Sequence, residues 1–458
     1  MSRRRAALLA GLLAGGLLTA SLRPNGASSA MVRRTPFGLS IEYPLLERAL
    51  GNGTCPSPAF VNALRELGSP TLRVGGDSQD LAGPTPAYHY FVPASFWSRF
   101  GCLARETGAP ITVGLNFGEG PVADESTTIA AAEQAIPASQ LAFSLGNEPD
   151  LYGIAHILPN EPGFTVPAYR PSPWTAGEYA SEWSNRRARL GPLRIEGPDL
   201  AGIGWRVPMT RLLERDPPDT MTVHAYPTVA CGSAGPTTTA ARLLSVHASV
   251  GLVEKYDWML TAARAAHREA VISESNSASC GGKPGVSDTP VAGVWAARYV
   301  VAALLRGWAQ VRFHCAGTSY DPLVVEADGT VKLRPLGHAL LFLSRWIPVG
   351  SRILSSARPP SSAAPHSFSV LPGRPSSHDE QGVLAATVRK GAHTTVILSS
   401  FSRKPSPFTV PVAGRARRVR TETLTRASAI EEPGTASVRG HEARLVLAPD
   451  TVVAVVER

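Results

Sequence analysis

Charged and sulfur-containing side chains are scarce in this chain. Of 458 residues, 18% are charged, 7% are aromatic and five are cysteine. The hydrophobic fraction of 43% supplies enough apolar side chains for a large core, which excludes an intrinsically disordered chain. No two cysteines have the close spacing of zinc ligands, so we expect neither a metal nor a cofactor.

Long apolar runs are also missing after residue 22, so we expect no membrane-spanning helix in the mature protein. The one such run, residues 6–22, follows three arginines and precedes small residues at 28–30. This order predicts a secretory signal peptide over residues 1–30 and a secreted protein. Because 17 residues is the lower limit for a spanning helix, a retained signal anchor is the alternative.

Eight segments between residues 37 and 345 have the pattern of buried parallel strands, since most are continuously apolar rather than alternating. They are 37–43, 71–75, 111–117, 142–146, 194–200, 221–226, 270–276 and 311–316. Helix-like segments separate them, among them one capped at Ser57, one with a capping box at Thr175 and Glu178, and one over 252–268. Eight strand–helix units predict a (β/α)8 barrel over residues 31–345. A doubly wound open sheet is the alternative, but no glycine-rich phosphate loop follows the first strand.

After residue 346 the chain changes to short apolar runs separated by turn residues, which predicts a C-terminal antiparallel β-sandwich over 346–458. This part has a net charge of +7, with Arg415, Arg417, Arg418 and Arg420 close together, whereas residues 31–345 have −2. The overall +9 therefore does not indicate a nucleic-acid partner. The arginines suit a solvated strand, or alternatively a contact with an anionic polymer.

Two glutamates stand where barrel enzymes place catalytic residues, at the C-terminal ends of strands. Glu148 follows the fourth predicted strand, and Glu274 ends the seventh. Each alone could cap a helix or pair with an arginine. Two carboxylates that face each other, one protonated and one ionised, are what glycoside hydrolysis requires. We therefore predict Glu148 as the acid/base and Glu274 as the nucleophile.

Other strand-end residues suit supporting roles in such a site. Asn147 could bind the sugar 2-hydroxyl, and Tyr226 could donate to Glu274, although an ordinary packed tyrosine is the alternative. Arg73 would supply positive charge near the two carboxylates, or form a salt bridge without a ligand role. His224 is expected to shape the site rather than carry a proton.

Together these motifs resemble retaining glycosidases of clan A, most closely glycoside hydrolase family 79, which holds exo-β-glucuronidases and heparanase-like endoglucuronidases. The resemblance covers nearly the whole chain after residue 30 and rests on segments 37–43, 73–80, 145–151, 273–277 and 311–318. It implies a barrel with a C-terminal β-sandwich, and the same roles for Glu148 and Glu274. It further implies that Asp77, and Glu42 at the end of the first strand, contact sugar hydroxyls.

In that family the loop after the nucleophile binds the glucuronate carboxylate. Here the loop is residues 277–282, in which Gly281 matches the glycine that donates its amide. Ser279 stands where tyrosine is common, and its hydroxyl can also donate. Since strands six and seven are neighbours, we predict a Cys231–Cys280 disulfide that braces this loop, with Cys55–Cys102 as a weaker second pair. Cys315, inside the eighth strand, is predicted to be a buried free thiol.

The sequence thus predicts a secreted exo-β-glucuronidase that takes a β-glucuronide or a uronic-acid-containing glycan. Three alternatives remain open. A relative acting on a neutral sugar would need no carboxylate-binding loop. An endo-acting enzyme on an acidic polysaccharide would need basic cleft walls, which the barrel's charge of −2 does not favour. A carbohydrate-binding protein on a decayed barrel would not need both carboxylates.

Overall fold

The computed structural model describes residues 29–158, 161, 163–231, 235–355, 382–412, 417–428 and 430–457. Residues 1–28 of the predicted signal peptide, most of the serine- and proline-rich stretch after residue 355, and Arg415 lie outside these ranges. Among the helices within them, none combines the length and the hydropathy that a bilayer crossing requires.

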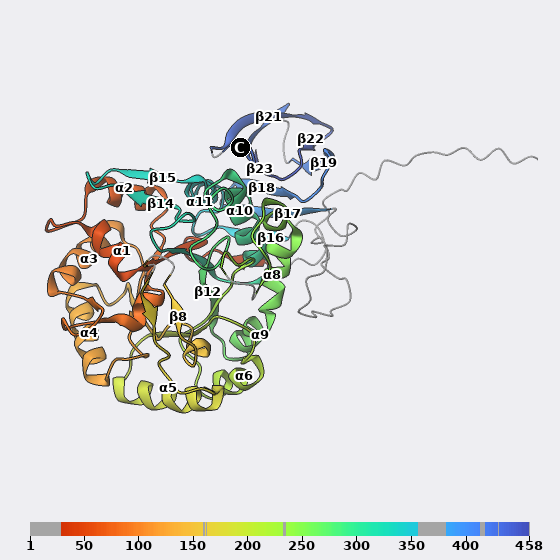
Figure 1. The fold of residues 1–458 in the computed structure, drawn as a ribbon. Coiled ribbons are helices and arrows are strands. Elements are labelled where there is room, and N and C mark those ends of the chain that lie inside the picture. Colours follow the sequence, from red (N-terminus) through yellow and green to blue (C-terminus); the bar gives the residue numbers. More distant parts are fainter. Residues whose placement is uncertain are drawn as a thin grey trace, which may run out of the picture.

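Eight parallel strands close into a barrel (Figure 1). In order around the barrel they are β10 (Ile195–Leu200), β11 (Thr220–His224), β12 (Glu269–Ser275), β13 (Gln310–Cys315), β2 (Phe37–Glu42), β3 (Thr71–Gly75), β6 (Ile111–Leu115) and β7 (Leu141–Leu145). Each overlaps one of the eight predicted segments, and the predicted (β/α)8 barrel is confirmed. Helices cover the outer faces of the strands, and this explains why the strands are continuously apolar.

The inside of the barrel also holds charged side chains. Arg312 on β13 is fully buried and donates to both carboxylate oxygens of Glu196 on β10, at 2.6 and 3.0 Å. Thr112 on β6 donates to the same carboxylate at 3.0 Å. This bidentate pair ties β13 to β10 through the inside of the barrel, and its members satisfy each other away from water.

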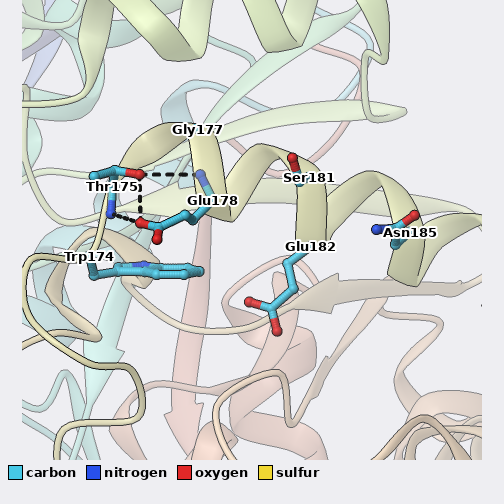
Figure 2. A pocket seen from close by; sticks show the side chains of 7 residues that line it. All are labelled: Trp174, Thr175, Gly177, Glu178, Ser181, Glu182 and Asn185. Carbon is cyan, nitrogen blue, oxygen red and sulfur yellow. Dashed lines mark hydrogen bonds between the residues drawn. The ribbon is translucent and has the colours of Figure 1, made fainter.

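The helices are α1 (Tyr43–Leu50), α2 (Pro58–Glu66), α3 (Ala94–Thr107), α4 (Val122–Ala135), α5 (Ala176–Leu190), α6 (Arg206–Arg215), α7 (Ala240–Leu243), α8 (Val250–Lys255), α9 (Asp257–Ala265), α10 (Pro290–Arg306) and α11 (Pro335–Trp346). The cap at Ser57 and the capping box of Thr175 and Glu178 are present, the latter drawn in Figure 2. The single helix predicted over 252–268 is wrong. At Tyr256, a buried residue, the backbone leaves the helical region (φ −106°, ψ 13°). The segment therefore forms two helices, α8 and α9.

A nine-stranded antiparallel sheet lies beside α10 and α11 (Figure 1). Its order is β1 (Ser29–Met31), β16 (Arg352–Ser355), β17 (Val383–Lys390), β18 (His393–Ser400), β23 (Thr451–Glu457), β20 (Arg418–Thr425), β21 (Glu432–Arg439), β22 (Glu442–Leu447) and β19 (Ser406–Pro411). One face encloses its own core around Leu398 and Phe408, while the other packs Leu384 and Ala454 into the barrel core. This is the predicted sandwich. The sequence missed β1, β16 and β21, and in β21 only Ala436 is buried, so no apolar alternation marks it.

Short elements extend the rim of the barrel. They are the one-turn helices η1 (Asp77–Leu81), η2 (Pro149–Leu151) and η3 (Val246–Ala248), and the strands β4 (Ala82–Gly83), β5 (Tyr90–Phe91), β8 (His156–Ile157), β9 (Thr165–Val166), β14 (Leu323–Val325) and β15 (Val331–Leu333). η1 follows β3 and η2 follows β7, so both lie at the C-terminal ends of barrel strands.

Candidate active site

The C-terminal ends of β7 and β12 bring the two predicted catalytic glutamates together. One carboxylate oxygen of Glu148, one of Glu274 and one ring nitrogen of His224 all lie within 4.8 Å of one another. Glu274 is 5% exposed at its side chain and Glu148 is 19% exposed, so the pair is sheltered but open on the side of Glu148. This is the arrangement that two strand-end carboxylates need in order to act on one bond.

Glu148 is held by its backbone as well as its side chain. Its φ of +48° is left-handed, its amide donates to the Asp199 carbonyl at 3.1 Å, and its carbonyl accepts from Leu151 at 2.8 Å. Its Oε1 lies 2.9 Å from Nδ1 of His224. Burial raises the pKa of Glu148 against the opposing effect of His224, and this favours the protonated acid.

Glu274 has the opposite protonation preference. Its Oε1 accepts from the Tyr226 hydroxyl at 2.9 Å, the contact expected from the sequence, and its Oε2 accepts from Arg73 at 3.0 Å. Burial alone would raise the pKa of Glu274. The charges of His314, His224 and Arg73, with the Tyr226 hydrogen bond, lower the pKa to about 2, so this carboxylate is ionised.

Arg73 is the central cation of the site. It is fully buried on β3 and donates to Ser40 at 2.8 Å, in addition to Glu274. Its other terminal nitrogen donates to Gln79 at 3.0 Å, to Asn147 at 2.9 Å and to Asp199 at 3.4 Å. The structure places the Arg73 charge at Glu274 through a salt bridge, and a ligand role for Arg73 stays a prediction. Arg73 also fixes the oxygen of Asn147, so that the Asn147 amide group faces Asp77 at 3.5 Å.

Two histidines flank the carboxylates. Burial would lower their pKa values, but Glu274 and the other neighbouring carboxylates raise the pKa of His224 to about 10 and that of His314 to about 9. His224 also lies 3.7 Å from Asp199, and His314 lies 2.9 Å from Glu42. The neighbouring carboxylates thus favour the charged form of both histidines.

The predicted sugar contacts Glu42 and Asp77 lie beside this group. Glu42 accepts from the amides of Asp77 and Ser78, from the Ser78 hydroxyl and from His314, and it is nearly fully buried. Glu42 thus positions η1 and His314. Asp77 is partly exposed and lies 3.7 Å from His156 on β8. Direct contact of either residue with a sugar stays a prediction.

Two buried aspartates of the site were missed from the sequence. Asp80 accepts from the amides of Phe117, Gly118 and Asn147 and from the Tyr152 hydroxyl, so it joins the loops after three strands. Burial raises its pKa to about 6. Asp199 accepts from Arg73 and Ser273. Because Asp199 lies at the end of the fifth strand, the same search for strand-end carboxylates could have found it.

The loop predicted to bind a uronate carboxylate is anchored to the neighbouring loop. The Ser279 amide donates to the Thr228 carbonyl at 3.0 Å, and the Ala230 amide donates to the Ser279 carbonyl at 3.3 Å. The predicted Cys231–Cys280 and Cys55–Cys102 disulfides are present, with Cα atoms 5.9 and 5.5 Å apart, and Cys315 is a buried free thiol. Gly281 is buried with a φ of +79°, a conformation that favours glycine.

A hollow lies on the outer face of α5, away from Glu148 and Glu274 (Figure 2). Its lining is Trp174, Thr175, Gly177, Glu178, Ser181, Glu182 and Asn185. Both of its carboxylates are engaged, since Glu178 belongs to the capping box and Glu182 pairs with Arg170 at 2.9 Å. It therefore offers no free pair of carboxylates.

A closed (β/α)8 barrel with such a carboxylate pair at the ends of its fourth and seventh strands is typical of barrel glycoside hydrolases. Comparison with known proteins narrows this class. No family model matches the chain. A β-glucuronidase of Aspergillus niger is 29% identical over a 201-residue alignment, and the match covers 38% of this chain and 35% of that protein. A β-glucuronidase of Neurospora crassa is 24% identical over a 329-residue alignment, and the match covers 61% of this chain and 57% of that protein.

Solved structures agree in fold. A 4-O-α-L-rhamnosyl-β-D-glucuronidase from Fusarium oxysporum has a TM-score of 0.68 and 20% identity over 95% of this chain and 99% of its own. A family 51 arabinofuranosidase from Xanthomonas axonopodis pv. citri has a TM-score of 0.64 and 14% identity over 94% and 97%. The chain spans from about a third to just over half of the length of the two curated relatives. The expected resemblance to family 79 glucuronidases is confirmed.

Proposed function

We propose that this protein is a retaining exo-β-glucuronidase. The observation that carries the proposal is the pair Glu148 and Glu274, with carboxylate oxygens within 4.8 Å and environments that drive their protonation apart. Retaining enzymes hold their two carboxyl groups about 5–5.5 Å apart, whereas inverting enzymes leave a wider gap for water. The short separation therefore supports retention.

In the proposed mechanism the ionised Glu274 attacks the anomeric carbon while Glu148 protonates the glycosidic oxygen. The C–O bond to the leaving alcohol breaks, and a covalent glycosyl–Glu274 ester forms. Glu148, now ionised, takes a proton from water, which attacks the same carbon and frees Glu274. Arg73 and Tyr226 orient Glu274 throughout, and Asn147, held by Arg73, is placed to bind the 2-hydroxyl.

Recognition of the sugar acid is assigned to the loop of residues 277–282, in which the Gly281 amide and the Ser279 hydroxyl would donate to the carboxylate. The Cys231–Cys280 disulfide supports this by fixing the loop. Serine in place of the tyrosine common in the family favours a second candidate, a hydrolase of neutral β-glycosides. We further propose secretion, which the two disulfides support because oxidising compartments maintain them.

Turnover of aryl β-glucuronide against aryl β-glucoside by the purified protein separates the two candidates. We expect the glucuronide to be cleaved and the β-anomer of the sugar to appear first in the NMR spectrum. Cleavage of the glucoside alone would establish the second candidate, and an α-anomer formed first would exclude retention.

Two variants test the roles of the glutamates. Glu274→Gln should abolish turnover of every substrate. Glu148→Gln should lower kcat on an unactivated alkyl glucuronide by about 10²–10⁴-fold and much less on an aryl glucuronide, because a good leaving group needs little protonation. Glu178→Gln, on the surface of α5, is the matched control and should keep full activity. Wild-type rates for Glu148→Gln on the alkyl glucuronide would refute the assignment.

A further inference from the structure

The segments that follow β7 and β10, the strands next to Glu148, expose apolar side chains. Exposed fractions are 38% for Leu151, 60% for Ile154, 38% for Ile203 and 60% for Val207. Leu151 and Ile154 follow β7, and Ile203 and Val207 follow the neighbouring strand β10. We call these four residues the apolar rim. Leu151, Ile154 and Ile203 lie on two adjacent loops and Val207 in the first turn of α6, so we treat these exposed hydrophobic residues as one candidate binding surface.

Hydrogen bonds fix this rim to the acid/base residue. The Asp150 carboxylate accepts from the amides of Ala201 and Gly202, at 2.9 and 3.0 Å, and so joins the two loops. The Leu151 amide donates to the Glu148 carbonyl at 2.8 Å, and the Ile154 amide donates to the Leu151 carbonyl at 2.9 Å. Trp174 braces the same turn by donating to the Pro149 carbonyl at 2.9 Å. Leu151 is therefore held within one turn of Glu148, and Asp150 ties the loop after β10 to the same turn.

Charged groups on these loops are few and already placed. In residues 149–157 and 201–208, all of which the structure describes, the charged or titratable side chains besides tyrosine are Asp150, His156 and Arg206. The Asp150 carboxylate already accepts from two backbone amides, and His156 faces Asp77. Only Arg206, at the start of α6, is left to meet a charged partner. An acidic polysaccharide would require several cations at this place.

The role proposed for Glu148 determines which part of the substrate the apolar rim would contact. Glu148 gives its proton to the leaving oxygen, whereas Glu274 attacks the opposite face of the anomeric carbon, so the group beyond Glu148 is the aglycone. Resting on the proposed function, we infer that the apolar rim is an aglycone site and that the preferred substrate is glucuronic acid joined to a largely hydrocarbon alcohol. Binding then removes apolar surface of both partners from water.

Three substrates, all with unactivated alcohols as leaving groups, test this inference. They are menthyl β-glucuronide, methyl β-glucuronide and a disaccharide of glucuronic acid β-linked to glucose. We expect wild-type kcat/KM to be at least about tenfold higher for the menthyl compound than for either other substrate. In Leu151→Ser/Ile154→Ser, and separately in Ile203→Ser, the menthyl-to-methyl ratio should fall about five- to tenfold. Val446→Ser, a substitution at a residue 71% exposed on β22, is the matched control and should keep the wild-type ratio.

Each result decides the inference. A wild-type preference for the disaccharide, or a menthyl-to-methyl ratio unchanged in both rim variants, would overturn it while leaving the glucuronidase proposal intact. The second of these results would show that the rim binds something other than the aglycone. Failure to cleave any of the three glucuronides would overturn the proposed function and this inference together.

Discussion

Glu148 and Glu274 are the same amino acid at the same edge of one barrel, yet their surroundings prepare them for opposite tasks. Glu274 accepts from Arg73 and Tyr226 and lies beside two cationic histidines, and these neighbours outweigh its burial. Glu148 has one close cationic neighbour, His224, and burial prevails. Two titratable groups whose environments push their pKa values apart are the usual means of assigning an acid and a nucleophile.

His224 contacts Glu148 at 2.9 Å and lies 3.8 Å from Glu274, so its positive charge lowers the pKa of both. His224→Gln removes this charge while keeping a hydrogen-bond donor, so both pKa values should rise. The acid limb of the pH profile, which reports ionisation of Glu274, and the alkaline limb, which reports deprotonation of Glu148, should both move to higher pH. We expect kcat/KM to fall roughly tenfold at the wild-type optimum, measured with an aryl glucuronide.

The control for this variant is His247→Gln, which replaces an exposed histidine on η3. It should leave both limbs in place. An alkaline limb that stays fixed or moves to lower pH in His224→Gln would show that His224 does not set the protonation of Glu148.

At the scale of elements, the site depends on the loops that follow barrel strands. These loops are held by contacts between neighbours: Glu42 and Asp80 bind backbone amides, and Cys231 binds Cys280. The second disulfide, Cys55–Cys102, joins the loop before α2 to α3 and lies outside the group of site residues. The chain thus offers a matched pair of disulfides.

The two disulfides close loops of 47 and 49 residues, so chain entropy gives each about the same contribution to stability, about 4 kcal/mol. Cys55→Ser/Cys102→Ser and Cys231→Ser/Cys280→Ser should therefore lower the free energy of unfolding in urea by similar amounts. Only the second should raise KM for a glucuronide, because it frees the loop assigned to the sugar carboxylate. An equal KM in both double variants would argue against that assignment.

At the scale of the whole molecule, the C-terminal sheet and the barrel share one core. Arg298 on α10 is fully buried, donates to the carbonyls of Leu244 and Ser400, and lies over the Phe401 ring at 4.5 Å. Arg298 also lies 3.4 Å from one carboxylate oxygen of Asp450. Arg426, an exposed residue, lies 3.4 Å from the other oxygen. The sheet is therefore attached to the barrel by burial and by a buried cation.

Arg298→Met should lower the free energy of unfolding by about 3 kcal/mol, because it leaves buried carbonyls without their donor. Arg426→Met, at a side chain 62% exposed and facing the same Asp450, should change it by less than about 1 kcal/mol. Urea unfolding at neutral pH measures both. Equal losses in the two variants would show that the contact with Asp450, rather than burial, governs the attachment.

Patterns of single residues were enough to predict the main elements. Eight continuously apolar segments with caps between them predicted the barrel, and strand-end position singled out Glu148, Glu274, Arg73, Asn147 and Tyr226. The pattern failed where a strand has little to bury, as in β21, and where the backbone leaves the helical region at a single residue, as at Tyr256. Asp80 could not be distinguished from its polar neighbours in η1, because its burial arises from loops that are distant in sequence.

The sequence by itself determined which residue types end the strands, because the period and polarity of a segment are local properties. Only the tertiary structure decided that Glu148 and Glu274 approach within 4.8 Å, and that Arg73, Tyr226, His224 and His314 surround them. These residues come from different strands, and barrel closure alone sets their distances. The pKa values of the two glutamates, and hence the proposed division of acid and nucleophile, depend on those distances and on burial.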